Sequence, residues 1–313
     1  MMQETASAPA STAGRHAPVR KSGRSDRAAY LFLAPWFIGF FGLTAGPMLA
    51  SLYLSFTDFS LLAPPEWVGA ENYAYMFEWD YRFWAALRVT FFYAFVSVPL
   101  TVTVALVVAS ALNRNISGEG ALRSAYYLPS LLGGSVAVAI MWRQIFGTNG
   151  MINQLLAPFG YEGGSWLATP SLAPWTLIFL HVWQFGAPMV IFLAGLKQIP
   201  RDYYDAARVD GASPLQQFFQ VTIPLMTPLI FFNLVMQIIV SFQAFAPAFI
   251  ISNGTGSPSD STLFYTLYLY IEGFMNFRMG YAAALAWILL LIIAVFTAIA
   301  FATSRFWVFH GDR

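Results

Sequence analysis

The sequence contains no cysteine and little charge of either sign. Only 10% of its 313 residues are charged, whereas 58% are hydrophobic. The lack of cysteine excludes disulfides, thiolate metal sites and cysteine catalysis. A soluble domain carries about 25% charged residues, so the scarcity of charge excludes an ordinary soluble protein. The net charge of +1 gives no indication of nucleic acid binding.

What the chain does have is a series of apolar runs, each near the length of about 20 residues that a helix needs to cross a bilayer. Six spans are predicted, at roughly 31–56, 88–112, 125–146, 172–195, 225–252 and 279–303. A β-barrel would need short alternating segments instead. The fold class is therefore an all-α integral membrane protein with about six transmembrane helices.

Residues 1–29 have a different composition from the rest of the chain. They are rich in Ala, Ser, Pro, Gly and Arg and almost lack large apolar side chains, which is typical of disorder. The next run, residues 30–56, is too long for a signal peptide and lacks a clear cleavage site. We therefore predict a disordered cytoplasmic tail at 1–29 and a single membrane domain at 30–313.

The basic residues divide unevenly between alternate loops. Four lie on one side: Arg82, Arg88, Arg143 and Arg278. The other twelve lie on the opposite side: Arg15, Arg20, Lys21, Arg24, Arg27, Arg114, Arg123, Lys197, Arg201, Arg208, Arg305 and Arg313. Lysine and arginine favour the cytoplasmic face, so both termini are predicted to be cytoplasmic, and so is the loop at 196–224.

This cytoplasmic loop is unusually polar and has the signals of two short helices. Pro200 suits a first helical turn, and Asp202 and Asp205 lie where the helix dipole favours acids. Gly211 is a natural helix stop because it tolerates a left-handed backbone. Ser213-Pro214 then begins a second helix, which is predicted to run from Leu215 to Thr222 before the chain returns to the membrane.

Two interpretations of this helix–turn–helix follow from the residues alone. It is either an amphipathic connector that rests on lipid headgroups or a docking element for a soluble partner. The small pair Ala206-Ala207 leaves one helix face flat enough to enter a groove of a partner. The composition of the loop does not decide between them.

The spacing of the loop resembles a known signature. The segment Asp205-Ala206-Ala207-x3-Gly211-x9-Val221-x-Ile223-Pro224 is similar to the EAA motif, E-A-A-x3-G-x9-I-x-L-P, of ABC importer permeases. Asp205 replaces Glu and is one methylene shorter, and Val221 and Ile223 are the other departures. The longer form, Tyr203-Tyr204-Asp205-Ala206-Ala207, resembles the maltose and glycerol-phosphate permease branch. Stretches such as Arg123-x-x-Tyr126-Tyr127-Leu128-Pro129 extend the resemblance over nearly everything after Tyr30.

The resemblance implies the fold of a type I ABC importer permease, which works with other chains. It implies two separate ATP-binding subunits, a second permease that is a different chain, and an extracytoplasmic solute-binding protein. The chain itself lacks the Gly-x4-Gly-Lys-Ser/Thr phosphate loop. The residues implied in ATPase coupling are Asp205, Ala206, Ala207, Asp210, Gly211 and Pro224.

The predicted spans contain almost no ionisable groups, which argues against ion coupling and against strongly charged solutes. His181 is expected to pack or to form hydrogen bonds, and Arg143 to extend to the membrane interface. No constellation of catalytic residues or metal ligands is present, so neither an enzyme nor a cofactor is expected.

The fifth span carries polar residues that could contact a solute. Asn233, Gln237 and Ser241 recur every four residues and so share one helix face, and Gln243 and Phe245 follow before Pro247. Amides in hydrocarbon need partners. They either hold neighbouring helices together or line a path for a hydroxyl-rich, uncharged solute. The resemblance places substrate contacts near Ser241 to Phe245.

The interpretation preferred is the permease subunit of an ATP-driven sugar or oligosaccharide importer in the bacterial inner membrane. A polyol or a glycerol phosphate is the alternative cargo. The competing class is a self-contained secondary transporter, which would have an intramembrane carboxylate and often repeated halves. Neither is evident in the sequence.

Overall fold

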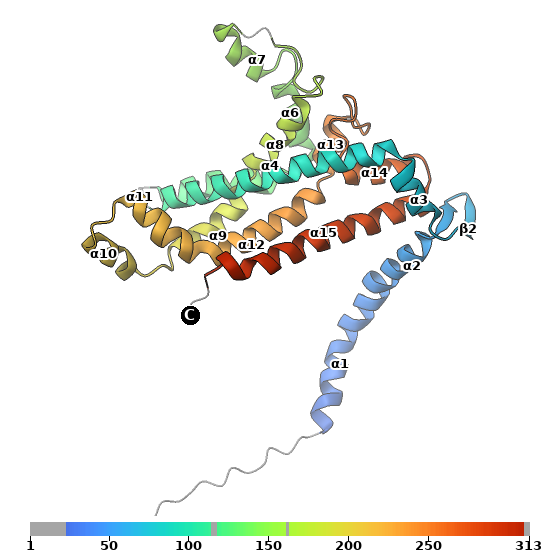
Figure 1. Cartoon of the computed structure of the whole chain (residues 1–313), viewed down its shortest axis with the longest axis horizontal. Helices are drawn as coiled ribbons and strands as arrows, with labels where there is room; N and C mark the ends of the chain where they lie inside the picture. Colours follow the sequence, from blue (N-terminus) through green and yellow to red (C-terminus); the bar gives the residue numbers. More distant parts are fainter. Residues whose placement is uncertain (1–22, 114–117, 161–162, 310–313) are drawn as a thin grey trace, which may run out of the picture. The chain divides into compact units, whose positions relative to one another are not determined.

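The computed structural model describes residues 23–113, 118–160 and 163–309. Its backbone is mostly helical (Figure 1), and it divides into two compact units, residues 1–50 and 51–313. The first unit contains α1 (Gly23–Phe40), the π-helical turn η1 (Phe41–Ala45) and the start of α2 (Gly46–Leu54).

The first residues of α1 fall within the segment 1–29 that composition predicts as a tail. Residues 1–22 of the predicted tail lie outside the described residues, but α1 begins at Gly23, before the predicted limit at residue 29. The segment Arg-Ser-Asp-Arg-Ala-Ala that follows Gly23 contains good helix formers, mainly Ala and Arg. The apolar helix therefore extends upstream into polar sequence that composition alone assigned to the tail.

The second unit begins with a small hairpin. Strands β1 (Thr57–Ser60) and β2 (Ala63–Trp67) pair antiparallel, and α3 (Glu71–Glu78) follows. The remaining helical elements are α4 (Tyr81–Leu112), α5 (Glu119–Leu132), α6 (Val136–Ile145), α7 (Met151–Leu156), η2 (Ala157–Phe159), α8 (Ala173–Trp183), α9 (Gly186–Leu196), α10 (Arg201–Val209), α11 (Pro214–Gln217), η3 (Phe218–Thr222), α12 (Ile223–Phe242), α13 (Ala246–Ile251), α14 (Tyr265–Tyr270), η4 (Ile271–Met275) and α15 (Met279–Trp307).

The long helix α4 is the centre of this second unit. It packs against α8, α9, α12 and α14, while α12 also packs against α15 and α9. One end of the unit holds α10 and α11, and the other holds α13 and α14 (Figure 1). Two apolar clusters stabilise the bundle. One joins α4, α9 and α12 toward the α10 end, and the larger one joins α4, α8, α14 and α15.

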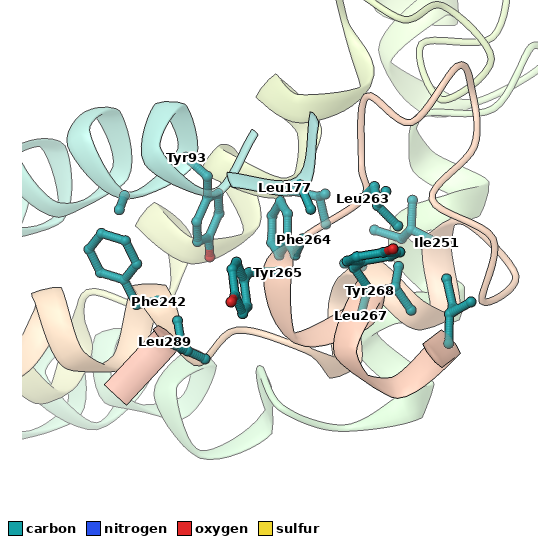
Figure 2. Close-up of a cluster of buried hydrophobic side chains, with 14 of the residues drawn as sticks. Tyr93, Leu177, Phe242, Ile251, Leu263, Phe264, Tyr265, Leu267, Tyr268 and Leu289 are labelled. Atoms are coloured by element: carbon teal, nitrogen blue, oxygen red, sulfur yellow. The ribbon is translucent and has the colours of Figure 1, made fainter. Parts of the chain in front are cut away.

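The larger cluster is organised around Tyr265, which is fully buried (Figure 2). Its backbone N–H donates to Thr90 Oγ1 of α4 at 2.8 Å, and its hydroxyl donates to the Leu285 carbonyl of α15 at 2.9 Å. The neighbouring Phe264 ring lies 4.5 Å from the Tyr93 ring, between centroids. Because buried polar groups are costly unless they are hydrogen-bonded, Tyr265 fixes α14 between α4 and α15.

The predicted spans agree with the structure except for the third. Five helices among the described residues are long and apolar enough to cross a membrane: Tyr30–Leu54, Tyr81–Leu112, Ala173–Leu196, Pro214–Ile251 and Met279–Trp307. The segment predicted as a continuous span at 125–146 is instead α5 and α6, which meet at an angle of 100°. Gly133 and Gly134 interrupt the helix, and Ser135 caps α6 by accepting from Val138 N–H.

The prediction that a separate second loop helix would end at Thr222 is also wrong. The helix that begins at Pro214 continues through Pro224 into α12, with the π-helical turn η3 between them. The Ile223 N–H donates to Phe218 O, five residues earlier. Proline lacks an N–H and clashes with the carbonyl four residues before it. The wider turn accommodates Pro224, so a proline does not end this helix.

Candidate functional site

The polar loop predicted from sequence forms α10, a tight turn and α11. Arg208 pairs with Asp205 at 2.8 Å across one helical turn, and both side chains are exposed. The hydroxyls of Tyr204 and Thr222 are 2.9 Å apart, which ties α10 to the start of α12. At the base of the loop, Lys197 pairs with Glu119 of α5. The loop is therefore anchored at both ends to the bundle.

Gly211 makes the turn between the two helices. Its φ of +78° lies in the left-handed region that favours glycine. The Gly211 N–H donates to Arg208 O at 3.0 Å, and the Ala212 N–H donates to Ala207 O at 2.9 Å, which is the hydrogen-bond pattern of a Schellman motif. The predicted helix stop at Gly211 is confirmed.

Ser213 and Pro214 start the second helix as the sequence predicted. The Gln216 N–H donates to Ser213 Oγ at 3.4 Å, and the Ser213 N–H donates to Gln216 Oε1 at 2.7 Å, completing a capping box. Large apolar side chains around the turn remain exposed, among them Val209, which is 88% exposed, and also Tyr203, Leu215 and Phe219. An anchored, capped turn with exposed apolar side chains is suited to contact another protein or a lipid surface.

A second candidate site lies where three helical segments are interrupted. The breaks fall at 133–135 between α5 and α6, at 184–185 between α8 and α9, and at 243–245 between α12 and α13. Residues of all three breaks line one cavity of about 400 Å³, among them Gly133, Gln184, Gln243 and Phe245. None of the described residues that line it carries a carboxylate, a guanidinium or an ammonium group. Interrupted helices at membrane depth are tolerated where they are buried in protein or line a water-filled cavity.

Close packing builds two of these breaks. Gly133 lies against the side chain of Gln184: a Cβ there would lie 2.0 Å from Gln184 Cδ, so the glutamine side chain would have to move to admit one. Ser130 of α5 bridges the α8–α9 break: its hydroxyl donates to Gln184 O at 2.9 Å and accepts from the Ala187 N–H at 3.0 Å. Ser130 thus satisfies backbone groups that the interruption would otherwise leave without partners.

His181 links two helices at the wall of the cavity. Its Nδ1 lies 3.0 Å from the Tyr93 hydroxyl of α4, and its Nε2 lies 3.0 Å from Gln237 Oε1 of α12. A smaller adjoining cavity of about 180 Å³ is lined by His181, Gln184 and Gln237. The expected hydrogen-bonding role of His181 is confirmed, and this histidine connects α4, α8 and α12.

Comparison with known proteins decides the family. The family model of the binding-protein-dependent transport system inner membrane component matches residues 32–306. The chain belongs to this family. It is a multi-pass membrane permease, and the family is one of transport components and not a class of enzymes.

The relatives and a solved structure agree with this assignment. Over 305 residues the permease is 50% identical to the probable ABC transporter permease protein YesP of Bacillus subtilis (strain 168), covering 96% of this chain and 99% of that one. It is 31% identical over 289 residues to the lactose transport system permease protein LacF of Rhizobium radiobacter, covering 90% and 95%. A bacterial alginate ABC transporter, solved in complex with an alginate pentasaccharide-bound periplasmic protein, superposes with a TM-score of 0.76 at 21% identity, covering 90% of this chain and 95% of that chain. The predicted type I permease fold is confirmed.

The polar residues predicted on the fifth span divide into two groups in the permease. Asn233 and Ser241 are buried and donate to carbonyls of their own helix, Leu229 O and Ile238 O. Gln237, Gln243 and Phe245 line the two cavities. The regular spacing of four residues therefore does not produce one continuous polar wall, because Asn233 and Ser241 bond to carbonyls of their own helix.

Sequence reasoning missed the residues that other helices contribute. Tyr93 and Gln184 line the cavity, and Ser97 and Thr101 follow Tyr93 along α4 with buried hydroxyls that have no partner among the described residues. Tyr93, Ser97 and Thr101 are spaced by four, so they share a helix face. That spacing was the available signal, but it was hidden among apolar residues of the same span.

The opposite end of the bundle carries most of the remaining charge. Asp80 caps α4 by accepting from the Arg82 and Phe83 N–H groups, and it also accepts from the hydroxyls of Tyr268 and Tyr281. Arg143, expected to extend to the interface, donates to Asn253 Oδ1 at 2.8 Å and lines a cavity of about 640 Å³. These contacts tie the loops at this end to the helices.

Arg278 precedes α15, at the end of this helix that packs against β1 and α3. Its guanidinium is 3.1 Å from Glu272 and lies over the rings of Tyr75 and Tyr281. Burial lowers the pKa of Arg278, but Glu272 and Tyr75 offset this, so the pKa lies above its ordinary value. The side chain therefore stays charged at any physiological pH.

Proposed function

We propose that this permease is the membrane-spanning subunit of an ATP-driven ABC importer that moves a sugar or oligosaccharide delivered by an extracytoplasmic binding protein. The proposed class of cargo rests on the cavity at the three helix breaks. Its polar wall consists of uncharged amide, imidazole and phenol groups. Amides offer both donors and acceptors to hydroxyls, and the Phe245 ring offers an apolar face to a sugar ring.

The name of one relative supports the same cargo class. LacF is a lactose transport system permease. A polyol or a glycerol phosphate is the alternative cargo. The uncharged wall favours a neutral solute over a phosphate, because an anion in this cavity would have no cation to pair with among its described lining residues.

The α10–α11 loop is proposed to seat in a cleft of an ATP-binding subunit. Asp205, Ala206, Ala207, Asp210 and Gly211 would lie at this contact, with Pro224 at the return to the bundle. The support is the exposed apolar side chains around a turn that hydrogen bonds and an ion pair anchor to the bundle. Closure of two such subunits would then rotate this permease against a second, different permease chain as rigid bodies.

The topology that goes with this function has both termini and the 196–224 loop in the cytoplasm of a bacterial cell, with the multi-pass domain in the inner membrane. The support is the distribution of lysine and arginine along the sequence. Arg201, Arg208 and Arg305 belong to α10 and to the last turn of α15, which lie at the same end of the bundle (Figure 1). Residues 1–29 would lie in the cytoplasm as a tail, with the first residues of α1 at its end.

The test is to purify the tagged permease from its native membrane in mild detergent and to identify the chains that accompany it. Recovery of ATP-binding subunits, a second permease and a binding protein is expected. The assembled complex is then reconstituted and supplied with lactose, maltotriose, arabinotriose, sorbitol and glycerol 3-phosphate. ATP-dependent uptake of a saccharide supports the proposal. Uptake without ATP by the permease alone contradicts it. Uptake of glycerol 3-phosphate but of no saccharide would show that the cargo is the alternative, a glycerol phosphate.

A further inference from the structure

The hydrogen bonds around His181 fix which groups of the cavity wall are free to bind a solute. Gln184 Nε2 donates to Leu180 O at 3.1 Å, so its Oε1 remains available as an acceptor. Gln237 Oε1 faces His181 at 3.0 Å, so its Nε2 has no partner among the described residues. The wall therefore presents a donor from α12 and an acceptor from the α8–α9 break.

Which end of the Gln237 amide faces the cavity, its NH₂ or its oxygen, depends on which ring nitrogen of His181 carries the proton. An amide oxygen only accepts hydrogen bonds, so His181 must carry its proton on Nε2 to donate to Gln237 Oε1. Nδ1 is then unprotonated and accepts from the Tyr93 hydroxyl at 3.0 Å. None of the described lining residues is a carboxylate that would stabilise an imidazolium, so the ring is neutral and both of its nitrogens are satisfied.

We propose that Tyr93 and His181 are positioning residues that hold the amide NH₂ of Gln237 toward the cavity, so that this point of the path binds an acceptor oxygen of the solute. Tyr93 is the start of the chain of hydrogen bonds, because a phenol donates readily to a ring nitrogen. His181 then donates to the amide oxygen of Gln237, and this contact leaves the Gln237 NH₂ facing the solute. The inference rests on the proposed function, since it assigns selectivity within the same cavity.

The opposite arrangement has a distinct consequence. If His181 carried its proton on Nδ1, that N–H would donate to Tyr93, and Nε2 would accept from the amide NH₂ of a rotated Gln237. The cavity would then present Gln237 Oε1 and would bind a hydroxyl donor instead. The two arrangements differ only in the exchange of the Gln237 amide oxygen and nitrogen and in the ring nitrogen of His181 that carries the proton, so the tautomer of His181 distinguishes them.

The first experiment reads the tautomer without any solute. The chain has three histidines, so H16Q/H310Q leaves His181 as the single ¹⁵N-histidine signal in lipid nanodiscs. Correlation of each ring nitrogen with its attached carbons should show a protonated Nε2 and an unprotonated Nδ1. The double variant Y93F/Q237L removes both partners and should show a mixture of tautomers. A protonated Nδ1, or an imidazolium, in the otherwise unchanged protein overturns the proposal.

The second experiment asks whether the donor selects the solute. Q237E keeps an oxygen that accepts from the His181 Nε2–H, whether the ring stays neutral or the new carboxylate makes it an imidazolium, and it replaces the free NH₂ by an acceptor. In proteoliposomes with the whole importer, the KM for whichever of lactose, maltotriose and arabinotriose is taken up should rise about tenfold, with the maximal rate retained. The matched control Q154E changes an exposed glutamine of α7 and should leave both values unchanged.

The outcomes separate the proposal from the function on which it rests. A Q237E protein with a reduced maximal rate and an unchanged KM shows a merely structural role and overturns the positioning assignment. If no saccharide is taken up by the unchanged importer, the proposed cargo is wrong, while the tautomer of His181 still decides the direction of the Gln237 amide.

Discussion

The α10–α11 loop and the cavity around His181 are both polar elements in an apolar chain, but their contacts span very different distances in sequence. The hydrogen bonds that shape the loop turn join residues at most five positions apart, as from Ala212 to Ala207. The bonds that shape the cavity wall join Tyr93 to His181, 88 positions apart, and His181 to Gln237, 56 positions apart. The loop depends on local backbone geometry, whereas the cavity depends on how closely the helices pack.

This difference predicts that a small added side chain will have unequal effects in the two regions. In the loop, a side chain at Gly211 would meet no atom within 4 Å, and only the backbone conformation opposes it. At the α8–α9 break, a Cβ at Gly186 would lie 2.4 Å from Tyr126 O and 2.7 Å from Tyr127 Cα. Backbone atoms of α5 would have to move to admit it.

The largest loss of stability is expected for Gly186→Ala. Because α5 must separate from α9, the free energy of unfolding should fall by roughly 1–3 kcal/mol, which thermal unfolding in detergent would detect as a lower midpoint. Gly134→Ala is the matched control, since a Cβ there meets nothing within 4 Å. Equal midpoints for both variants would show that the close approach of α5 and α9 is unimportant.

Gly211→Val should disturb the loop and leave the bundle folded. A branched side chain in the left-handed region costs about 1–2 kcal/mol, enough to distort the turn between α10 and α11. The expected result is loss of the ATP-binding subunits from the purified complex, measured by quantitative mass spectrometry. Gly160→Val is the control, because Gly160 has a similar φ of +80° and equally open surroundings. Retention of the subunits in Gly211→Val would refute the proposed contact.

Ser213→Ala should have a smaller effect, confined to the second half of the loop. Removing the capping side chain costs about 1 kcal/mol, so the first turn of α11 should open more often. Hydrogen exchange of the Gln216 amide should become about fivefold faster, while exchange in α4 stays the same. Faster exchange throughout α12 instead would mean that the loop and the bundle are not independent.

The smallest effect is expected for Arg208→Ala. The Arg208–Asp205 pair is exposed on both sides, and exposed ion pairs contribute between 0 and about 1 kcal/mol. The unfolding midpoint should stay within error of the unchanged protein. A large fall in the midpoint would indicate that this pair stabilises the loop.

The comparison also explains what the sequence could predict. The Gly211 turn, the Ser213 cap and five of the six spans are local patterns, and each is found where it was predicted. The break at Gly133 was missed because the apolar pattern continues across it and is typical of one span. Pro224 was misread as the end of a helix because η3 widens the backbone before it, a feature with no clear sequence signal.

The cavity could be predicted only in part. Gln237 and Gln243 were found by their spacing and by their position before Pro247. Tyr93 and Gln184 were not, because their role depends on how α4, α8 and α12 pack together. In the sequence His181 is the single ionisable residue of its apolar run, and nothing near it in sequence indicates its two partners.

The central claim, that the α10–α11 loop is the contact with an ATP-binding subunit, is tested most directly at Val209. The chain has no cysteine of its own, so Val209→Cys gives one reactive site at a side chain that is 88% exposed. Its rate of reaction with a membrane-impermeant maleimide is measured in the purified permease and in the assembled importer, with Phe159→Cys as the exposed control. The account predicts rapid reaction in the permease alone and strong protection at residue 209 in the importer. Equal rates in both preparations would contradict it.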